Sequence, residues 1–140
     1  MLNTTRNEFK KSFNAHFNLY VESEGTSSLN TRRLMIFYCV ECGLKNLLLK
    51  QIGKNTYEDL QQYKDSIHKD VAGHNLKELT KEIGIESAYP LKSIKLKKGS
   101  VQPRQYNELW RYGVTVENEE DAQREEKTLY DIALWIKQRI

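Results

Sequence analysis

The sequence predicts an all-α fold, an up-and-down bundle of about five helices in a single domain that spans residues 1–140. Apolar side chains recur at steps of three and four in five segments, which is the helical period. One short segment alternates as a strand does, and it has no clear partner strand. The 140 residues, 39% of them hydrophobic, are enough to bury one core. We therefore expect a helical bundle with one long irregular connection.

The predicted central helix runs from residue 32 to residue 50, because this stretch is apolar on more than one face. Its main stripe contains Leu34, Phe37, Tyr38, Glu41, Leu44, Lys45 and Leu48. Four further apolar residues lie off the stripe, namely Met35, Val40, Cys42 and Leu49. The pattern predicts that other helices cover this one. Ser28 or Asn30 is the expected N-cap, and Gly53 is expected to close the helix in a left-handed conformation.

The remaining helices are predicted from their period and their terminal residues. A first helix over residues 4–20 places its aromatic side chains on one line, at Phe9, Phe13, Phe17 and Tyr20. A third helix, of about ten to fourteen residues, follows the capping box of Thr56 and Asp59. A fourth covers residues 75–83 and ends at Gly84, and a helical turn over residues 105–112 ends at Gly113. The last helix begins after Asn118 with acidic residues and ends with basic ones.

The candidate polyanion-binding segment starts within the irregular connection at residues 85–103. Between residues 87 and 107 the chain has no acidic residue and five basic ones, Lys92, Lys95, Lys97, Lys98 and Arg104. These charges would hold phosphates, and the nearby Tyr89 and Tyr106 would stack bases, as in sequence-tolerant single-strand binding. A solvated loop without a ligand is the alternative interpretation. The sequence leaves both open.

The overall composition argues against several protein classes. The formal net charge is only +3 although 29% of the residues are charged, so charge alone does not indicate a nucleic-acid-binding protein. Two cysteines are too few for the disulfide framework of a small secreted domain, and no signal-peptide pattern opens the chain. The apolar run of the central helix is too short to span a membrane and contains charges. We expect a cytoplasmic protein with no membrane partner and no cofactor.

The two cysteines, Cys39 and Cys42, have the CxxC spacing of many metal sites. They lie in the middle of a predicted helix, however, and no second pair or nearby His completes a set of four ligands. We therefore predict no metal site and interpret both thiols as core residues.

Four motifs, in order along residues 30–140, resemble the HEPN domain family (higher eukaryotes and prokaryotes nucleotide-binding). They are YCVECGLKNLLL at 38–49, GHNLKEL at 73–79, YNELWRYG at 106–113 and the long amphipathic last helix. Three positions depart from the usual pattern of the family. Asn75 stands in place of Asp, Trp110 in place of Ala and Gly113 in place of Pro.

The resemblance implies an all-helical domain that forms two-fold homodimers, often beside a nucleotidyltransferase in toxin–antitoxin and phage-defence systems. Many members are metal-independent ribonucleases that use an Arg followed four to six residues later by a His. No Arg of this chain is followed by a His at that distance. The resemblance therefore implies a non-catalytic binding or regulatory module that is associated with nucleotide or RNA chemistry.

Two other functions remain open. One is an endoribonuclease with a different active site, built from His74 with Arg104 or Arg111, and the other is a structural partner of a larger enzyme. The purely structural interpretation of His74 is that it caps a helix or forms a hydrogen bond into the core. Glu41 and Lys45, at i and i+4, are either a half-buried ion pair that extends to Arg111 or part of a nucleotide site. The candidates for nucleotide or RNA binding are Glu41, Lys45, Lys92, Lys95, Lys97, Lys98, Arg104, Tyr106, Arg111 and Tyr112.

Overall fold

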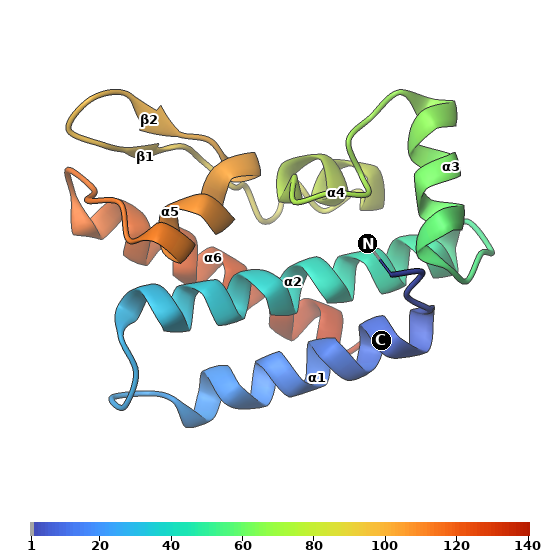
Figure 1. Ribbon diagram of the computed structural model, residues 1–140, viewed down its shortest axis with the longest axis horizontal. Helices are drawn as coiled ribbons and strands as arrows, with labels where there is room; N and C mark the ends of the chain where they lie inside the picture. Colours follow the sequence, from blue (N-terminus) through green and yellow to red (C-terminus); the bar gives the residue numbers. More distant parts are fainter. Residues whose placement is uncertain (1) are drawn as a thin grey trace.

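The computed structural model describes residues 2–140 and confirms the all-α bundle (Figure 1). Six α-helices are present in this part of the chain, together with one small hairpin and one 3-10 turn. In order, the elements are α1 (Arg6–Glu22), α2 (Leu29–Gln51), α3 (Tyr57–Ile67), α4 (Leu76–Ile83), β1 (Ile94–Lys95), β2 (Ser100–Val101), η1 (Pro103–Gln105), α5 (Tyr106–Tyr112) and α6 (Glu119–Lys137).

Helix α2 is the central element, as its apolar pattern predicted, although it begins earlier than expected, at Leu29. Helices α1 and α6 pack along it, and α4 and α5 contact it as well. Figure 1 shows α1 beside α2, with α4, α5 and the hairpin on the opposite side of α2 and α3 near its C-terminal end. Helix α2 therefore separates two layers, and any site along its edges is formed by residues distant in sequence.

Side chains at the N-terminal ends of the helices cap them at the positions that the sequence predicted. The Ser28 hydroxyl accepts a hydrogen bond from the Thr31 backbone N–H at 3.1 Å, which selects Ser28 rather than Asn30 as the cap of α2. Thr56 and Asp59 form the predicted capping box of α3. Asn118 caps α6. These bonds satisfy backbone donors that the first turn of a helix leaves free.

The helices end at the predicted glycines for a conformational reason. Gly84 and Gly113 have φ of 93° and 63°, and both follow directly on the last residue of a helix. A residue without Cβ adopts this left-handed conformation without steric cost. Gly53, with φ 69°, lies two residues beyond the end of α2, after the C-cap Ile52.

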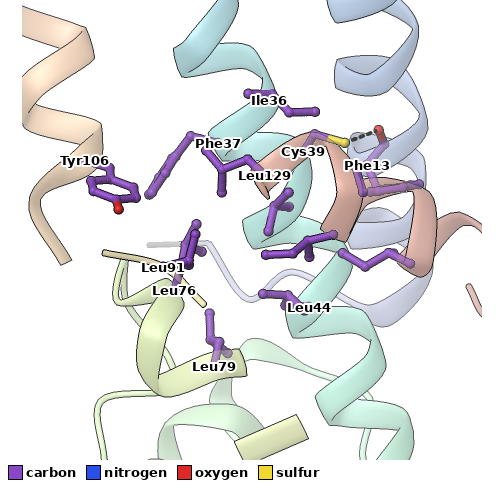
Figure 2. Packing of buried hydrophobic residues seen from close by; sticks show 14 of the residues in the cluster. Phe13, Ile36, Phe37, Cys39, Leu44, Leu76, Leu79, Leu91, Tyr106 and Leu129 are labelled. Carbon is purple, nitrogen blue, oxygen red and sulfur yellow. Dashed lines mark hydrogen bonds between the residues drawn. The ribbon is translucent and has the colours of Figure 1, made fainter. Parts of the chain in front are cut away.

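One hydrophobic core joins all the helices, and Figure 2 shows its central residues from several elements. Gly43 of α2 permits the closest approach within this core. A Cβ at this position would lie 2.7 Å from Ile136 Cγ2 and 2.8 Å from Phe13 Cδ2, and both of these side chains are fully buried. The missing side chain therefore lets α1 and α6 meet against α2.

Two details of the expected fold were wrong. The irregular connection contains an antiparallel hairpin, in which Ile94 pairs with Val101 and Lys95 with Ser100. The partner strand was not recognised because it is only two residues long and has no alternating pattern of its own. In addition, the spacing of Met35 and Val40 off the main stripe of α2 predicts that they form part of a dimer surface, and this is wrong for Val40, which is fully buried inside the chain.

Candidate functional site

The candidate site centres on Glu41, a carboxylate that is largely buried near the middle of α2. Its Oε2 accepts a hydrogen bond from Lys45 Nζ at 3.3 Å, one helical turn along α2. Its Oε1 lies 2.6 Å from His74 Nδ1, which comes from the segment before α4. One carboxylate therefore holds two side chains, and only the pairing with Lys45 was visible in the sequence.

His74 is the accessible member of this group, with 52% of its side chain exposed. The hydrogen bond to Glu41 raises the pKa of the imidazole above its usual 6.5, although partial burial and the charges of Lys45 and Arg111 act in the opposite direction. Because a carboxylate only accepts, we assign the proton that faces Glu41 to Nδ1. The other ring nitrogen, Nε2, has no hydrogen-bond partner in residues 2–140. It is free to donate to a ligand when the ring is protonated. His74 does not cap α4, because Asn75 does so.

Arg111, at the end of α5, completes the group from the other side. Its NH2 donates a hydrogen bond to the Tyr38 hydroxyl at 3.0 Å. The buried ring of Phe37 is close to both sides, with its centroid 5.5 Å from that of Tyr38 and 6.4 Å from that of His74. Tyr38, Glu41, Lys45, His74 and Arg111 are called the Glu41 cluster below.

The Glu41 cluster carries an excess of positive charge. Lys45 and Arg111 are cationic, Glu41 is anionic, and His74 adds a further positive charge when it is protonated. Lys45 is a buried charge, with 2% of its side chain exposed, and Glu41 is its only hydrogen-bonding partner in the described chain. The arrangement is therefore suited to an anion that contacts His74 and Arg111, while the buried charge of Lys45 attracts the anion without touching it.

Two residues in or beside this cluster could not be assigned to it from the sequence. Tyr38 lies on the same helical stripe as Glu41 and Lys45, but the stripe did not indicate that its hydroxyl accepts a hydrogen bond from Arg111. His16 was not identified at all. Its ring lies 6.1 Å from that of Tyr38, and its Nδ1 is 2.8 Å from the Ser12 carbonyl, so the ring is held beside the cluster. Nothing in the sequence relates His16 to α2.

The predicted basic segment is divided between the hairpin and its flanks. Lys92, Lys95, Lys97, Lys98 and Arg104 are all exposed. Within residues 2–140, Arg104 makes no side-chain hydrogen bond or ion pair, whereas the charge of Arg111 lowers the pKa of His74.

The two aromatic candidates of this region have opposite environments. Tyr112 is 70% exposed and is available for contact. Tyr106 is fully buried, which corrects its expected role in stacking bases. Its hydroxyl donates to the Lys92 carbonyl and to the buried Glu125, whose Oε1 also accepts from the Lys92 N–H at 2.9 Å. Tyr106 and Glu125 therefore fix the base of the hairpin.

The acidic start of α6 lies next to the basic hairpin. The Glu117 N–H donates to the Lys95 carbonyl at 3.0 Å, and Val116 forms a β-bridge with Leu96. Acidic residues that follow Glu117 begin α6. Because this negative charge weakens the attraction of the hairpin for polyanions, the Glu41 cluster is the better candidate for an anion.

The two cysteines lie against α1. Cys39 is fully buried and donates to the Phe13 carbonyl at 3.5 Å, and Cys42 donates to the Ser12 hydroxyl at 3.3 Å. Burial raises the pKa of both thiols, which keeps them protonated. In residues 2–140, no three side chains of His, Cys, Asp or Glu come together in a way that would hold a metal ion.

A second charged cluster, which the sequence did not indicate, connects the start of α2 to α6. The Glu126 carboxylate accepts hydrogen bonds from the Tyr20 hydroxyl at 2.6 Å, from Arg33 Nε at 2.8 Å and from Arg32 NH1 at 3.4 Å. These four residues are called the Glu126 cluster below. It links α1, α2 and α6 and lies beside a cavity of about 400 Å³.

Comparison with known proteins gave no matching family model, no similar curated protein and no matching solved structure. The resemblance to HEPN domains therefore stays a prediction that rests on the four motifs. None of the helices in residues 2–140 combines the length and apolar character needed to cross a bilayer.

Proposed function

We propose that this chain is a non-catalytic helical module that binds a phosphate-bearing ligand, RNA or a nucleotide, at the Glu41 cluster. The supporting observation is that one buried carboxylate holds Lys45 and His74 while Arg111 lies close enough to influence the pKa of His74. Two accessible donors over a buried positive charge fit a phosphate group, which supplies several acceptor oxygens.

The motifs that resemble HEPN domains extend this proposal to a biological setting. We propose a cytoplasmic regulatory or binding component of a toxin–antitoxin or phage-defence system, with a nucleotidyltransferase or another defence protein as a partner. The chain is also proposed to act as a homodimer. Light scattering at micromolar concentration tests the last point, because a dimer has twice the chain mass of 16.5 kDa.

Binding of a short single-stranded RNA, followed by fluorescence anisotropy at several salt concentrations, tests the ligand. Arg111→Ala is expected to weaken binding at least tenfold and to lower the salt slope by about 0.7, the value for one lost phosphate contact on a single strand. Lys81→Ala is the matched control, because Lys81 is exposed on α4 and its substitution also removes one positive charge. Equal affinities of the two variants would contradict the proposed site.

The basic hairpin is tested in the same assay. If Lys92, Lys95, Lys97 and Lys98 contact the strand, replacing all four by Ala lowers the salt slope by about 0.7 for each contact. Because the four side chains are exposed, the free energy of unfolding is expected to change little. A large loss of binding in this variant, with none in Arg111→Ala, would move the site to the hairpin.

A second candidate function is metal-independent RNA cleavage, and the Glu41–His74 hydrogen bond favours it. A carboxylate that keeps an imidazole protonated provides a general acid for the leaving 5′-oxygen, and Arg111 is placed to stabilise the phosphate. Incubation of RNA with the protein in the presence of EDTA tests this function. Cleavage by the wild type that is lost in a folded His74→Ala variant would make the chain an enzyme.

A further inference from the structure

Arg33 lies between two cavities outside the Glu41 cluster. One cavity, of about 400 Å³, borders on α1, α2 and α6, and the other, of about 380 Å³, borders on α2, α5, α6 and the loop before α6. Both cavities are lined by Arg33 and by Glu119, the first residue of α6. The ion pair of these two residues therefore borders both cavities.

The two carboxylates that bind Arg33 are held very differently. Glu126 accepts from Arg33 Nε at 2.8 Å and is fixed by Tyr20 and Arg32 as well. Glu119 lies 2.5 Å from Arg33 NH1, and it has no other side-chain bond in residues 2–140. The Arg33 side chain is 5% exposed, whereas that of Glu119 is 57% exposed. The guanidinium is thus a buried, fixed group, and Glu119 is the partner that can leave.

The second cavity has a mainly polar surface, to which the exposed Val114 and the partly exposed Val116 add an apolar part. Its apolar lining consists of Leu109, Trp110, Val114, Val116 and Ala122. The amide of Asn30 also lines the cavity. Trp110 is 3% exposed, and its Nε1 has no hydrogen-bond partner in the described chain. A buried indole N–H without an acceptor is unusual, because buried polar groups are nearly always bonded.

We propose that Arg33 is the centre of a binding site for a carboxylate carried on an apolar body, and that Glu119 occupies the site as an internal plug. The ligand carboxylate replaces that of Glu119 on the guanidinium, a geometry that carboxylates and guanidinium groups share. The apolar part lies against Val114 and Val116, next to the buried Trp110. A phosphate dianion fits less well, because Glu117 and Glu126 keep negative charge near the site.

Benzoate is the probe, and benzamide is its neutral counterpart of nearly the same shape. Binding is followed by the indole N–H signals in nitrogen-15 NMR spectra, in which Trp135→Phe assigns the signal of Trp110. Removing the internal competitor raises the apparent affinity, because a tethered group is present at high effective concentration. Glu119→Gln is therefore expected to bind benzoate at least ten times more tightly than the wild type, with a shift of the Trp110 signal. Benzamide is expected to leave the signal unchanged.

Glu120→Gln is the matched control, since Glu120 is exposed in the same turn and does not contact Arg33. It is expected to bind benzoate as weakly as the wild type. Equal affinities of the two variants, or equal binding of benzoate and benzamide, would overturn the proposal. Circular dichroism checks the fold, and Glu119→Ala serves as a second variant. Unfolding of both Glu119 variants would show that Glu119 is a structural residue rather than a plug, which also overturns the proposal.

Discussion

The two charged clusters of α2 differ in how completely their groups are paired. In the Glu126 cluster, one carboxylate receives three donors, and the backbone carbonyl of Tyr20 and the hydroxyl of Ser23 accept further bonds from Arg32. In the Glu41 cluster, the carboxylate binds two side chains, and within residues 2–140 His74 Nε2 and most of the Arg111 donors have no partner. The carboxylate of the first cluster therefore connects helices, whereas the second cluster has several donors left for a phosphate-bearing ligand.

The comparison shows why burial of charge does not identify a functional site. Arg33 and Lys45 are both nearly inaccessible, yet their neighbours differ. A buried charge needs a partner, and losing that partner costs more than forming the pair gains. The partners of Glu126 fix three helices, while the exposed face of His74 shows that the Glu41 cluster reaches the surface.

Glu126→Gln is expected to have the largest effect on stability. The variant leaves Arg32 and Arg33 without their shared carboxylate, and neither guanidinium is able to lose its charge. We expect the free energy of unfolding to fall by about 3 kcal/mol, measured by urea denaturation. Glu120→Gln, an exposed change in the same helix, should stay within about 0.5 kcal/mol of the wild type. Similar losses of stability in both variants would show that the Glu126 cluster does not stabilise the packing of α1, α2 and α6.

Gly43→Ala is expected to have the next largest effect, because the added methyl group meets Ile136 and Phe13 at less than 3.0 Å. Both side chains are enclosed in the core and have little room to move. We expect a loss of about 2 kcal/mol from overpacking, despite the better helix propensity of Ala. Thermal unfolding measures this loss. An increase in the melting temperature would show that α1 and α6 separate easily.

Glu41→Gln is expected to cost no more than Gly43→Ala, at most about 2 kcal/mol, because the Gln carbonyl still accepts a hydrogen bond from Lys45. The same variant is expected to lower RNA affinity, since it removes the group that orients His74. The two variants are expected to differ in RNA binding. Glu126→Gln should lower stability, but a folded sample of it should still bind RNA. If Glu126→Gln abolished RNA binding in the folded protein, the assignment of a structural role to Glu126 and of RNA binding to the Glu41 cluster would be wrong.

The pH dependence of His74 gives a smaller effect of known sign. The folded pKa is raised above 6.5, so the hydrogen bond to Glu41 stabilises the protein fully below that pH and is lost as pH rises through the folded pKa. Because His74 is half exposed, its contribution is expected to stay below about 1 kcal/mol. NMR titration of the imidazole measures the pKa, which should decrease in Glu41→Gln. A wild-type pKa at or below 6.5 would contradict the role of Glu41.

The sequence by itself determined the helices of this protein. Helical period, the capping groups of Ser28, Thr56 and Asn118, and the glycines after three of the helices are local features. They act over three or four residues, so they are readable along the chain. The i, i+4 spacing of Glu41 and Lys45 indicated their ion pair for the same reason.

Only the tertiary structure decided which residues form a site. His74 lies 33 residues from Glu41, and Arg111 lies 73 residues from Tyr38, so no local spacing connects them. Burial of Tyr106 and Val40, and the three donors on Glu126, depend on which helices pack against α2. Periodicity specifies which face of a helix is apolar, but the partner that covers it follows from the packing of the whole bundle.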